Sequence, residues 1–370
     1  MNAHPSQPAS LPIPTSLAEI TASWLTRALA AGGVLPGATV TRYTPESIAE
    51  GKGFTNRVFR LHLEYQRPNP GLPASLLVKL PATDPLMLPL FRLLGPNLRE
   101  VNFYRNLSRD CALQTPVCYF GQADPATGNS ALLLEDLGSA RQGDSVAGCS
   151  LDEARQIARR LAAFHAQWWD SPLLDGLVWL PPRDDEALAY QELHEPSWRS
   201  LTEKTGRLLP PGLRQLGDSM PDLFGRVKSM LAESPRTIVH GDFRLDNFYY
   251  PADAASPAPL VLDWEYCGIG RGVFDLATFV CEAFPPAQRR REEWGLLTEY
   301  HSALTASGIT GYSLNQCWND YRLSLLDVFA LWIVGGAFCD YSGERATTFL
   351  SNTLQRLDAA ISDLRPLSLL

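Results

Sequence analysis

Hydrophobic residues recur with two different spacings along the chain, and the change between these spacings divides it into two parts. Between residues 58 and 134, apolar residues stand in short runs bounded by glycine, proline or polar residues, as is typical of β-strands. From residue 151 onward they recur every three or four positions over long stretches, as is typical of amphipathic helices. The pattern predicts a strand-rich first part and a helix-rich second part.

The first part contains two neighbouring strand-like runs, residues 58–65 and 76–80, with a stretch rich in proline and glycine between them. This arrangement predicts a β-hairpin. A polar helical segment that carries Glu100 follows, and further strand-like runs occupy residues 116–120 and 131–134. We therefore expect a small sheet with one helix packed on it.

Two capping-box patterns mark helix starts, because a serine oxygen and a glutamate carboxylate three residues later can satisfy free backbone N–H groups. Ser16 with Glu19 predicts a first helix that ends at the glycine pair after residue 31. Ser150 with Glu153 predicts a long helix through Trp169. Further helical patterns occupy residues 186–232 and 285–368, and short strand-like runs occupy residues 237–239 and 260–262.

The chain of 370 residues is long for one compact domain, so two lobes are expected. The change of pattern places the boundary at residues 137–138. We expect a flexible N-terminal tail (residues 1–15), a β-rich N-lobe (16–136) and an α-rich C-lobe (137–370). This is the α+β fold class.

Composition and charge narrow the class of protein. Hydrophobic residues make up 45% of the chain and charged residues 19%, which is ordinary for a globular protein. The net charge of −8 argues against nucleic acid and against an anionic membrane as partners. No run of eighteen apolar residues is present, and the 7 scattered cysteines form no CxxC pair. These features favour a cytoplasmic protein with buried thiols, and they leave its oligomeric state open.

The segment from Val239 to Asn247, VHGDFRLDN, carries the strongest chemical signal. Asp242 and Asn247 stand five residues apart after a short apolar strand, and Asp263 ends another apolar run in LVLDWE. Phosphoryl transfer needs a base near the attacking hydroxyl and hard oxygen ligands for Mg²⁺. The spacing equals that of Asp and Asn in the protein-kinase catalytic loop.

HGDFRLDN followed by LDWE resembles the aminoglycoside phosphotransferase and choline-kinase-like group, with the closest match in the ecdysteroid-kinase-like branch and its bacterial relatives. The similarity spans residues 45–285, and it implies a bilobal protein-kinase-like fold. It also implies that Asp242 is the catalytic base and that Asn247 and Asp263 hold Mg²⁺. By the same resemblance, His240 would support the loop, and Asp275 would accept backbone N–H groups from it.

The first part supplies the matching nucleotide-binding residues. Lys79 lies in the otherwise apolar run SLLVKLP, where a charge is costly unless it is paired. In kinases such a lysine contacts the α- and β-phosphates of ATP and pairs with a helical glutamate, for which Glu100 is the candidate.

A glycine-containing turn and a hinge complete the expected nucleotide site. Gly51, Gly53, Thr55 and Asn56 precede the strand that begins near residue 58, and exposed backbone N–H groups of such a turn can cover phosphates. The segment LLLEDLG is similar to the hinge between the lobes, where backbone groups from Glu135 to Leu137 would bind adenine or guanine. Either ATP or GTP is therefore the expected co-substrate.

The acceptor is expected to be a small hydroxylated molecule. Only eleven residues separate Asp263 from Asp275 and no APE sequence follows, so the segment that presents a peptide in protein kinases is missing. Every tryptophan except Trp24 lies in the second part, and Trp264 is the best candidate to contact an apolar or polycyclic acceptor. Acids that would bind an aminoglycoside are also present but not placed, namely Glu195, Glu282 and Asp340.

Two other functions compete with a small-molecule kinase. One is a pseudokinase-like protein that binds nucleotide without catalysis, and the retained Lys79, Asp242, Asn247 and Asp263 argue against it. The other is a metal-dependent hydrolase, which is weaker because the 6 histidines show no ligand spacing.

Overall fold

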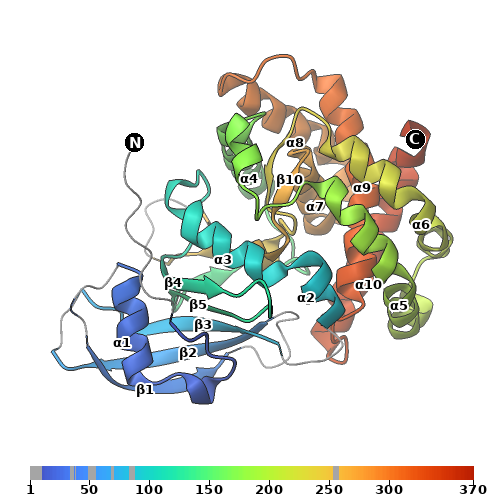
Figure 1. Cartoon of the computed structure of the whole chain (residues 1–370). Coiled ribbons are helices and arrows are strands. Elements are labelled where there is room, and N and C mark those ends of the chain that lie inside the picture. The colour runs from blue at the N-terminus through green and yellow to red at the C-terminus, as the bar shows by residue number, and fades with distance from the viewer. Residues whose placement is uncertain are drawn as a thin grey trace. The chain divides into compact units, whose positions relative to one another are not determined.

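The computed structural model describes residues 11–33, 37, 39–48, 56–67, 71–82, 88–252 and 258–370, with residues 88 and 89 described by their backbone alone. The chain forms two compact units (Figure 1). The first consists of the described residues up to Arg109 together with Pro116–Gly138, and the second of Asp110–Thr115 together with Ser139–Leu370. The first unit is rich in strands and the second in helices, so the predicted α+β class is confirmed.

The first unit is built on a five-stranded antiparallel sheet with the strand order β1-β2-β3-β5-β4. The strands are β1 (Val40–Ser47), β2 (Asn56–Tyr65), β3 (Ser75–Pro81), β4 (Cys118–Ala123) and β5 (Ser130–Glu135). The predicted hairpin is present as β2 and β3. The sequence missed β1, because its outward-facing residues are mostly exposed and polar and include a proline. Strand β3 lies in the middle of the sheet.

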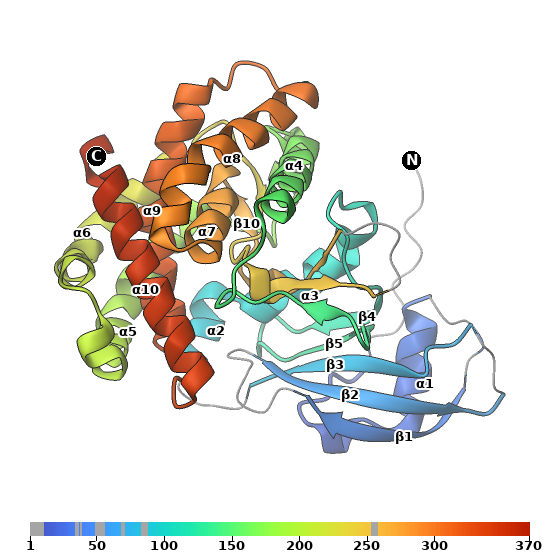
Figure 2. The same cartoon turned by 180° about the vertical axis from the view of Figure 1, so that it is seen from behind.

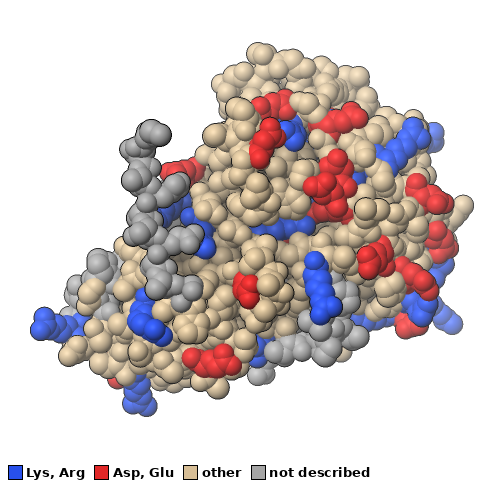
Figure 3. All heavy atoms as spheres, in the orientation of Figure 1, with Lys and Arg blue, Asp and Glu red and all other residues tan. Residues whose placement is uncertain are grey.

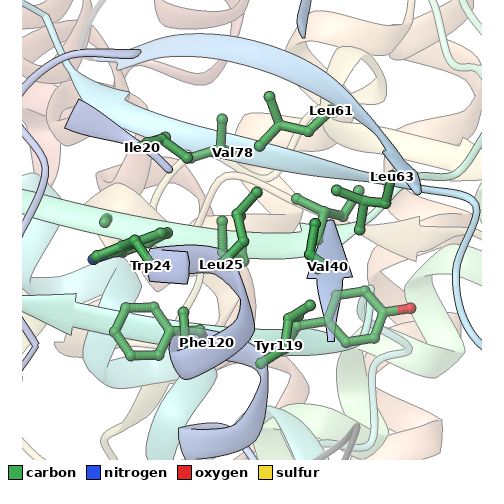
Figure 4. Packing of buried hydrophobic residues seen from close by; sticks show 14 of the residues in the cluster. Ile20, Trp24, Leu25, Val40, Leu61, Leu63, Val78, Tyr119 and Phe120 are labelled. Atoms are coloured by element: carbon green, nitrogen blue, oxygen red, sulfur yellow. The ribbon is translucent and has the colours of Figure 1, made fainter. Parts of the chain in front are cut away.

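The core of the first unit lies between helix α1 (Ala22–Ala31) and one face of this sheet. Trp24 and Leu25 of α1 pack against alternate residues of the strands, among them Val78 and Phe120 (Figure 4). The rings of Trp24 and Phe120 meet edge to face at 5.6 Å. Each large side chain buried in this way contributes about 1.5–3 kcal/mol to stability, which holds the middle strands flat against α1.

The other face of the sheet is covered by α3 (Pro96–Asn106), which follows the short helix α2 (Leu88–Leu94). Strand alternation requires this division, because Val78 faces α1 and its neighbour Lys79 must then face the opposite side. Gly121 of β4 is closely surrounded, because a Cβ there would lie 3.2 Å from the Leu132 side chain of β5 and 3.4 Å from Val101 of α3. The expected polar helix is therefore present and carries Glu100 beneath β3.

The first capping box does not form, which corrects the predicted start of the first helix. Ser16 makes no side-chain cap, and Thr15 instead donates hydrogen bonds to the Glu19 carboxylate from its backbone N–H and its hydroxyl, both at 2.9 Å. Helix α1 begins later, where Thr21 Oγ1 accepts a hydrogen bond from the Trp24 N–H at 3.0 Å. A threonine with extended backbone competes successfully for the cap, because it is positioned directly before the helical residues.

The second unit is mainly helical, and its helices are α4 (Leu151–Trp168), α5 (Ala187–Thr205), α6 (Pro211–Ala232), α7 (Val273–Ala283), α8 (Pro286–Ala306), α9 (Leu314–Gly336) and α10 (Glu344–Leu364). The capping box of Ser150 and Glu153 is complete, as predicted. Helix α9 is the central one: every residue from Leu323 to Val334 is buried, and α5, α6, α7, α8 and α10 contact it (Figure 2).

A buried ionic network lies on α9 at Asp327. Arg183 donates to Asp327 Oδ2 at 2.6 Å, and Lys228 Nζ lies 2.9 Å from Oδ1 of the same carboxylate and 3.1 Å from Glu186. The Lys228 ammonium also lies 3.7 Å from the ring centre of Tyr190. Although burial opposes it, Arg183 and Lys228 lower the pKa of Asp327. The charges cancel within the network, so it joins α5, α6 and α9 as a structural unit.

Short strands in the second unit hold two loops that carry the motif residues. They are β6 (Arg141–Gln142), β7 (Thr237–Val239), β8 (Phe248–Tyr250), β9 (Leu260–Val261) and β10 (Gly268–Gly270). β7 pairs with β10, and β8 lies between β6 and β9. The sequence missed β6, β8 and β10, because strands of two or three residues are too short to show alternation.

Charged side chains of both signs occur on the face of the molecule that Figure 3 shows. In Figure 3 the two signs are interspersed, unlike a continuous basic stripe. Within the described part of the chain, no helix has the length and apolar character that crossing a bilayer requires.

Candidate active site

The loop from His240 to Asn247 begins with a tight turn that only glycine can make. Gly241 has φ of 89°, and a Cβ at this position would lie 2.0 Å from the carbonyl oxygen of Tyr266. A side chain would therefore clash with the backbone and force an unfavourable conformation. This glycine lets the chain turn sharply out of β7 and brings Asp242 to the start of the loop.

Asp275 on α7 holds this turn from behind. Its Oδ2 accepts the His240 N–H at 2.7 Å, and its Oδ1 accepts the Gly241 N–H at 3.0 Å. His165 of α4 also contacts Oδ2 through Nε2 at 3.2 Å, and the Tyr300 hydroxyl lies 2.8 Å from His165 Nδ1. All of these side chains are fully buried. The contacts to the two backbone N–H groups are those that the family resemblance implies for Asp275.

His240 links the loop to the strand that carries Asp263. Its Nε2 lies 2.8 Å from the Leu262 carbonyl oxygen, and its Nδ1 accepts the Asp242 N–H at 3.2 Å. These two bonds together place the ring proton on Nε2. Because the ring is buried and both nitrogens are engaged within the fold, its contacts are those of a structural residue.

The Asp242 carboxylate is held on one side and open on the other. Its Oδ2 accepts hydrogen bonds from Asn247 Nδ2 at 3.0 Å and from Arg244 Nε at 3.1 Å. None of the described residues donates to Oδ1, and the side chain is 20% exposed. Asn247 Nδ2 also donates to the Asp242 carbonyl oxygen at 2.8 Å, so the amide oxygen of Asn247 faces away from Asp242.

Asp263 adopts an uncommon backbone conformation directly after β9. Its φ and ψ are both 61°, the left-handed region, which costs free energy for a residue other than glycine. The neighbouring Leu262 N–H donates to the Asn247 carbonyl oxygen at 3.0 Å, so Asn247 and Asp263 leave their paired segments at the same end. The arrangement brings an amide and a carboxylate, both hard oxygen donors, to one edge.

In the first unit, Lys79 and Glu100 form an ion pair with 2.7 Å between Nζ and Oε1. Both are buried, at 7% and 2% exposure. Lys79 belongs to the middle strand β3, paired with Val58 on one side and Leu132 on the other. Lys79 therefore lies neither on an edge strand nor exposed to solvent.

The predicted hinge residues lie at and after the end of β5. Glu135 is its last residue, and its N–H donates to the Val117 carbonyl oxygen at 2.8 Å. Leu137 follows and is half-buried. Asn56 is buried at the start of β2. The remaining predicted phosphate-loop residues lie outside the described residues, namely Gly51, Gly53 and Thr55.

Asp136, which local spacing does not mark as a site residue, anchors the turn after β5. Its carboxylate accepts hydrogen bonds from Arg60 Nε at 2.7 Å, Ser75 Oγ at 2.6 Å and the Gly138 N–H at 3.1 Å. Although burial opposes it, the bonds from Arg60 and Ser75 lower the pKa of Asp136. An acid directly after an apolar strand was the available signal.

The comparison with protein families agrees with this geometry. The phosphotransferase enzyme family matches residues 50–306, which include Lys79, Asp242, Asn247 and Asp263. The chain belongs to the phosphotransferase enzyme family. A search of the curated proteins returns no significant match.

Solved structures with the same fold support this family's protein-kinase-like architecture. An ethanolamine kinase from Plasmodium vivax is 14% identical, with a TM-score of 0.51 over 86% of this chain and 82% of that one. The choline kinase LicA from Streptococcus pneumoniae is 15% identical, with a TM-score of 0.51 over 88% and 94%. The complex of APH(2″)-IIIa with GDP and kanamycin is 13% identical, with a TM-score of 0.52 over 92% and 98%. The predicted fold, with a small β-rich and a large α-helical lobe, is confirmed.

Trp264 does not occupy the position that the sequence predicts for it in this phosphotransferase. The side chain is fully buried, and its Nε1 donates to the Val261 carbonyl oxygen at 3.1 Å. Its ring lies 4.5 Å from that of His240, centre to centre. The prediction of a contact with the acceptor is wrong, because the turn η8 (Trp264–Tyr266) points the indole into the core.

Glu282 of α7 interacts electrostatically with Arg244 and Asp242 of the loop, although it lies about forty residues further along the chain. Its Oε1 accepts a hydrogen bond from Trp332 Nε1 at 2.9 Å, and Oε2 has no partner among the described residues. Burial raises the pKa of Glu282 to about 7, with Arg244 opposing the rise and Asp242 adding to it. The available sign in the sequence was an acid within the largely apolar stretch VFDLATFVCEA, which forms the buried helix α7.

The other two acids considered for an aminoglycoside site lie in ordinary surface settings. Glu195 is exposed and pairs with Arg199 on the same helix at 2.6 Å. Asp340 is exposed and accepts hydrogen bonds from Ser342. Neither contact differs from those of a solvated surface acid, so Glu282 is the acid of the three that has an unusual environment.

Proposed function

We propose that this protein is a small-molecule kinase that transfers the γ-phosphoryl group of ATP or GTP to a hydroxyl group. The observation that carries the proposal is the geometry of Asp242, whose Oδ2 is held by Asn247 and Arg244 while Oδ1 remains open. A carboxylate fixed in this way is suited to receive a proton from a substrate hydroxyl. Membership of the phosphotransferase family supports the same reaction.

In the proposed reaction, the acceptor hydroxyl donates a hydrogen bond to Oδ1 of Asp242. Its oxygen attacks the γ-phosphorus, the bond between that phosphorus and the β,γ-bridging oxygen breaks, and the hydroxyl proton passes to Asp242. The products are a phosphate ester and ADP or GDP, with the charge developing on the leaving diphosphate. Little covalent work falls to the protein, so the position of Asp242 is its main contribution.

We assign Asn247 and Asp263 as the residues that would hold Mg²⁺. They fit the ion because the Asn247 nitrogen is engaged by Asp242, which leaves its oxygen available, and because Asp263 adds a carboxylate. Amide and carboxylate oxygens are the ligands that Mg²⁺ prefers. When bound, the ion would neutralise charge on the nucleotide phosphates.

We assign the nucleotide to the first unit. Lys79, fixed by Glu100, would contact the α- and β-phosphates, and backbone groups from Glu135 to Leu137 would bind the base. The Asp136 anchor supports this role, because it fixes the turn that those backbone groups form. The proposed phosphate-covering turn contains Gly51, Gly53, Thr55 and Asn56. Both ATP and GTP remain candidates, and the GDP complex of APH(2″)-IIIa supports testing GTP.

We propose a bulky, largely apolar alcohol, such as a steroid, terpenoid or macrolide, as the acceptor. Every tryptophan except Trp24 belongs to the same unit as Asp242. Aromatic side chains with a few polar groups are typical of pockets for such molecules. This choice agrees with the proposed ecdysteroid-kinase-like branch, which rests on HGDFRLDN and LDWE. We also propose a cytoplasmic location, because all seven cysteines are free.

A screen of hydroxylated metabolites and antibiotics with ATP and with GTP tests the proposed function. The wild-type protein is expected to release ADP or GDP only when a suitable alcohol is present, and ³¹P NMR should detect the phosphate ester. Asp242→Asn should bind nucleotide equally well but form the ester about 10²–10⁴-fold more slowly. Nucleotide binding by calorimetry without transfer to any alcohol would instead favour the pseudokinase-like alternative.

A further inference from the structure

Helix α10 contacts the catalytic loop although it lies outside the residues that match the family. Three of its residues, Arg345, Phe349 and Arg356, fall on one side of the helix, because their spacings of four and eleven residues bring them close to whole turns. Each of them reaches the loop or the segments packed against it. Figure 2 shows α10 running past α7 and α9, which it also contacts.

The arginines of α10 hold the surroundings of the loop. Arg345 donates to Asp246 Oδ1 at 3.0 Å and to Asp144 Oδ1 at 2.9 Å. Asp246 also accepts the Ser145 N–H at 3.2 Å. Arg356 donates to the Ser145 carbonyl oxygen at 2.7 Å and to the carbonyl oxygen of Glu282. These bonds tie the loop, the turn at 144–145 and the end of α7 to a single helix.

Phe349 contacts Arg244, which is one of the two loop side chains that bind the proposed base directly. The Arg244 guanidinium lies 5.3 Å from the centre of the Phe349 ring, within the range of a cation–π interaction. Although burial opposes it, the carboxylates of Asp242 and Glu282 raise the pKa of Arg244, so it stays charged. Its side chain is only 14% exposed, and it contacts Asp242 Oδ2 through Nε.

The two residues that donate to Asp242 Oδ2, Asn247 and Arg244, constrain the carboxylate in different ways. Asn247 Nδ2 bonds both the carbonyl oxygen and Oδ2 of Asp242, which fixes the distance between backbone and carboxylate. Arg244 approaches Oδ2 as the second donor and fixes the rotation of the carboxylate, which decides where Oδ1 points. A single bond from Asn247 leaves that rotation free.

We propose that Arg244 is a positioning residue that sets the orientation of Asp242, and that α10 holds Arg244 in place through Phe349. The proposal rests on the proposed kinase function, in which Oδ1 receives the acceptor proton. It extends the catalytic machinery to a helix beyond the matched family residues. A misplaced base loses rate without losing nucleotide affinity, because the nucleotide does not depend on Oδ1.

Steady-state kinetics of Arg244→Ala and Phe349→Ala test this proposal. Arg244→Ala is expected to lower kcat about 10–100-fold, an amount typical of a misplaced reacting group, with the KM for nucleotide unchanged. Arg244→Lys and added guanidinium should each restore part of kcat, which loss of a merely structural residue would not allow. Arg199→Ala, on an exposed helix face, is the matched arginine control and should behave as wild type.

The pairing with α10 is tested by combining the substitutions. Phe349→Ala is expected to lower kcat about 3–10-fold in the same manner, by loosening Arg244, whereas Phe349→Tyr keeps the ring and should be close to wild type. The double variant Arg244→Ala/Phe349→Ala should be no slower than Arg244→Ala, since Phe349 acts through Arg244. Independent, multiplying losses would overturn the role of α10.

Crystal structures of the wild type and Arg244→Ala separate this inference from the proposed function. The inference expects the Asp242 carboxylate to rotate so that Oδ1 changes position, whatever the acceptor. An unchanged Asp242, or a kcat within twofold of wild type, would overturn it. If the wild type transfers phosphate to no alcohol, the proposed function fails, and the carboxylate orientation still decides the role of Arg244.

Discussion

The two units hold their site residues by different means. In the first unit, Lys79 belongs to the middle strand of a sheet and Glu100 to a helix, so regular backbone hydrogen bonds fix both. In the second unit, Asp242 and Asn247 lie on a loop with little regular structure. Side chains from distant segments, above all Asp275, supply the bonds that the loop lacks.

Because of this difference, we expect the effects of substitutions on stability and on function to be separable in the first unit and coupled in the second. A strand or helix keeps its backbone bonds when one side chain is replaced. An irregular loop loses its conformation when a buried acceptor of its N–H groups is removed, because those groups are then left without partners. We therefore expect substitutions in the first unit to change nucleotide binding alone, and those beneath the loop to change stability and turnover together.

The largest effect is expected for Asp242→Asn, which removes the base without disturbing its neighbours. Turnover should fall about 10²–10⁴-fold, the range for loss of a general base. The midpoint of chemical unfolding should change little, because the amide can keep the bonds to Asn247 and Arg244. Transfer within tenfold of the wild-type rate, measured by release of ADP or GDP, would remove Asp242 from its assigned role.

Asp275→Ala should couple stability to turnover in the second unit. It leaves the N–H groups of His240 and Gly241 without their acceptor, and each such buried group costs about 1–3 kcal/mol. Urea unfolding should therefore show a loss of about 2–6 kcal/mol, accompanied by lower kcat in the folded fraction. Asp275→Asn keeps one acceptor oxygen, so its free energy of unfolding should lie between those of the wild type and Asp275→Ala. A destabilised variant with full kcat would contradict the coupling.

The double variant Lys79→Met/Glu100→Leu should have the opposite profile in the first unit. Replacing a buried ion pair by apolar side chains is often close to neutral for stability, so a change within about 1 kcal/mol is expected. Nucleotide affinity, measured by calorimetry, should nevertheless fall at least about tenfold, since the phosphates lose a cation. Unchanged affinity would show that the pair is structural, like the network around Asp327.

The smallest effect is a pH dependence that originates at Glu282. Its pKa in the folded protein is about 7, above that of an exposed glutamate, so the folded state keeps a proton that the unfolded chain releases. Its contribution is therefore fully present at low pH and is lost as pH rises through about 7. Glu282→Gln should flatten this decline by on the order of 2 kcal/mol in urea titrations between pH 5 and 8. If the free energy of unfolding of Glu282→Gln and of the wild type changed with pH in parallel, Glu282 would not be the origin of this pH dependence.

Much of the architecture could be predicted from periodicity alone. The hairpin of β2 and β3, the helix that carries Glu100 and the capped start of α4 have the residues and spacing that the structure uses. The start of the first helix was predicted wrongly, because two residues compete to cap it. Ser16 and Thr21 both offer a cap, and the contact between Thr15 and Glu19 decides between them.

The candidate site divides in the same way. By itself, the sequence determined which residues can supply a base and oxygen ligands, because Asp242, Asn247 and Asp263 stand at motif spacing after short apolar runs. It did not determine that Trp264 points into the core or that Glu282 meets Trp332, fifty residues further on. It also did not determine that Arg244 lies against Phe349 of α10. Local spacing encodes backbone conformation, whereas packing between distant helices sets the orientation and charge of each side chain, and only the tertiary structure brings those helices together.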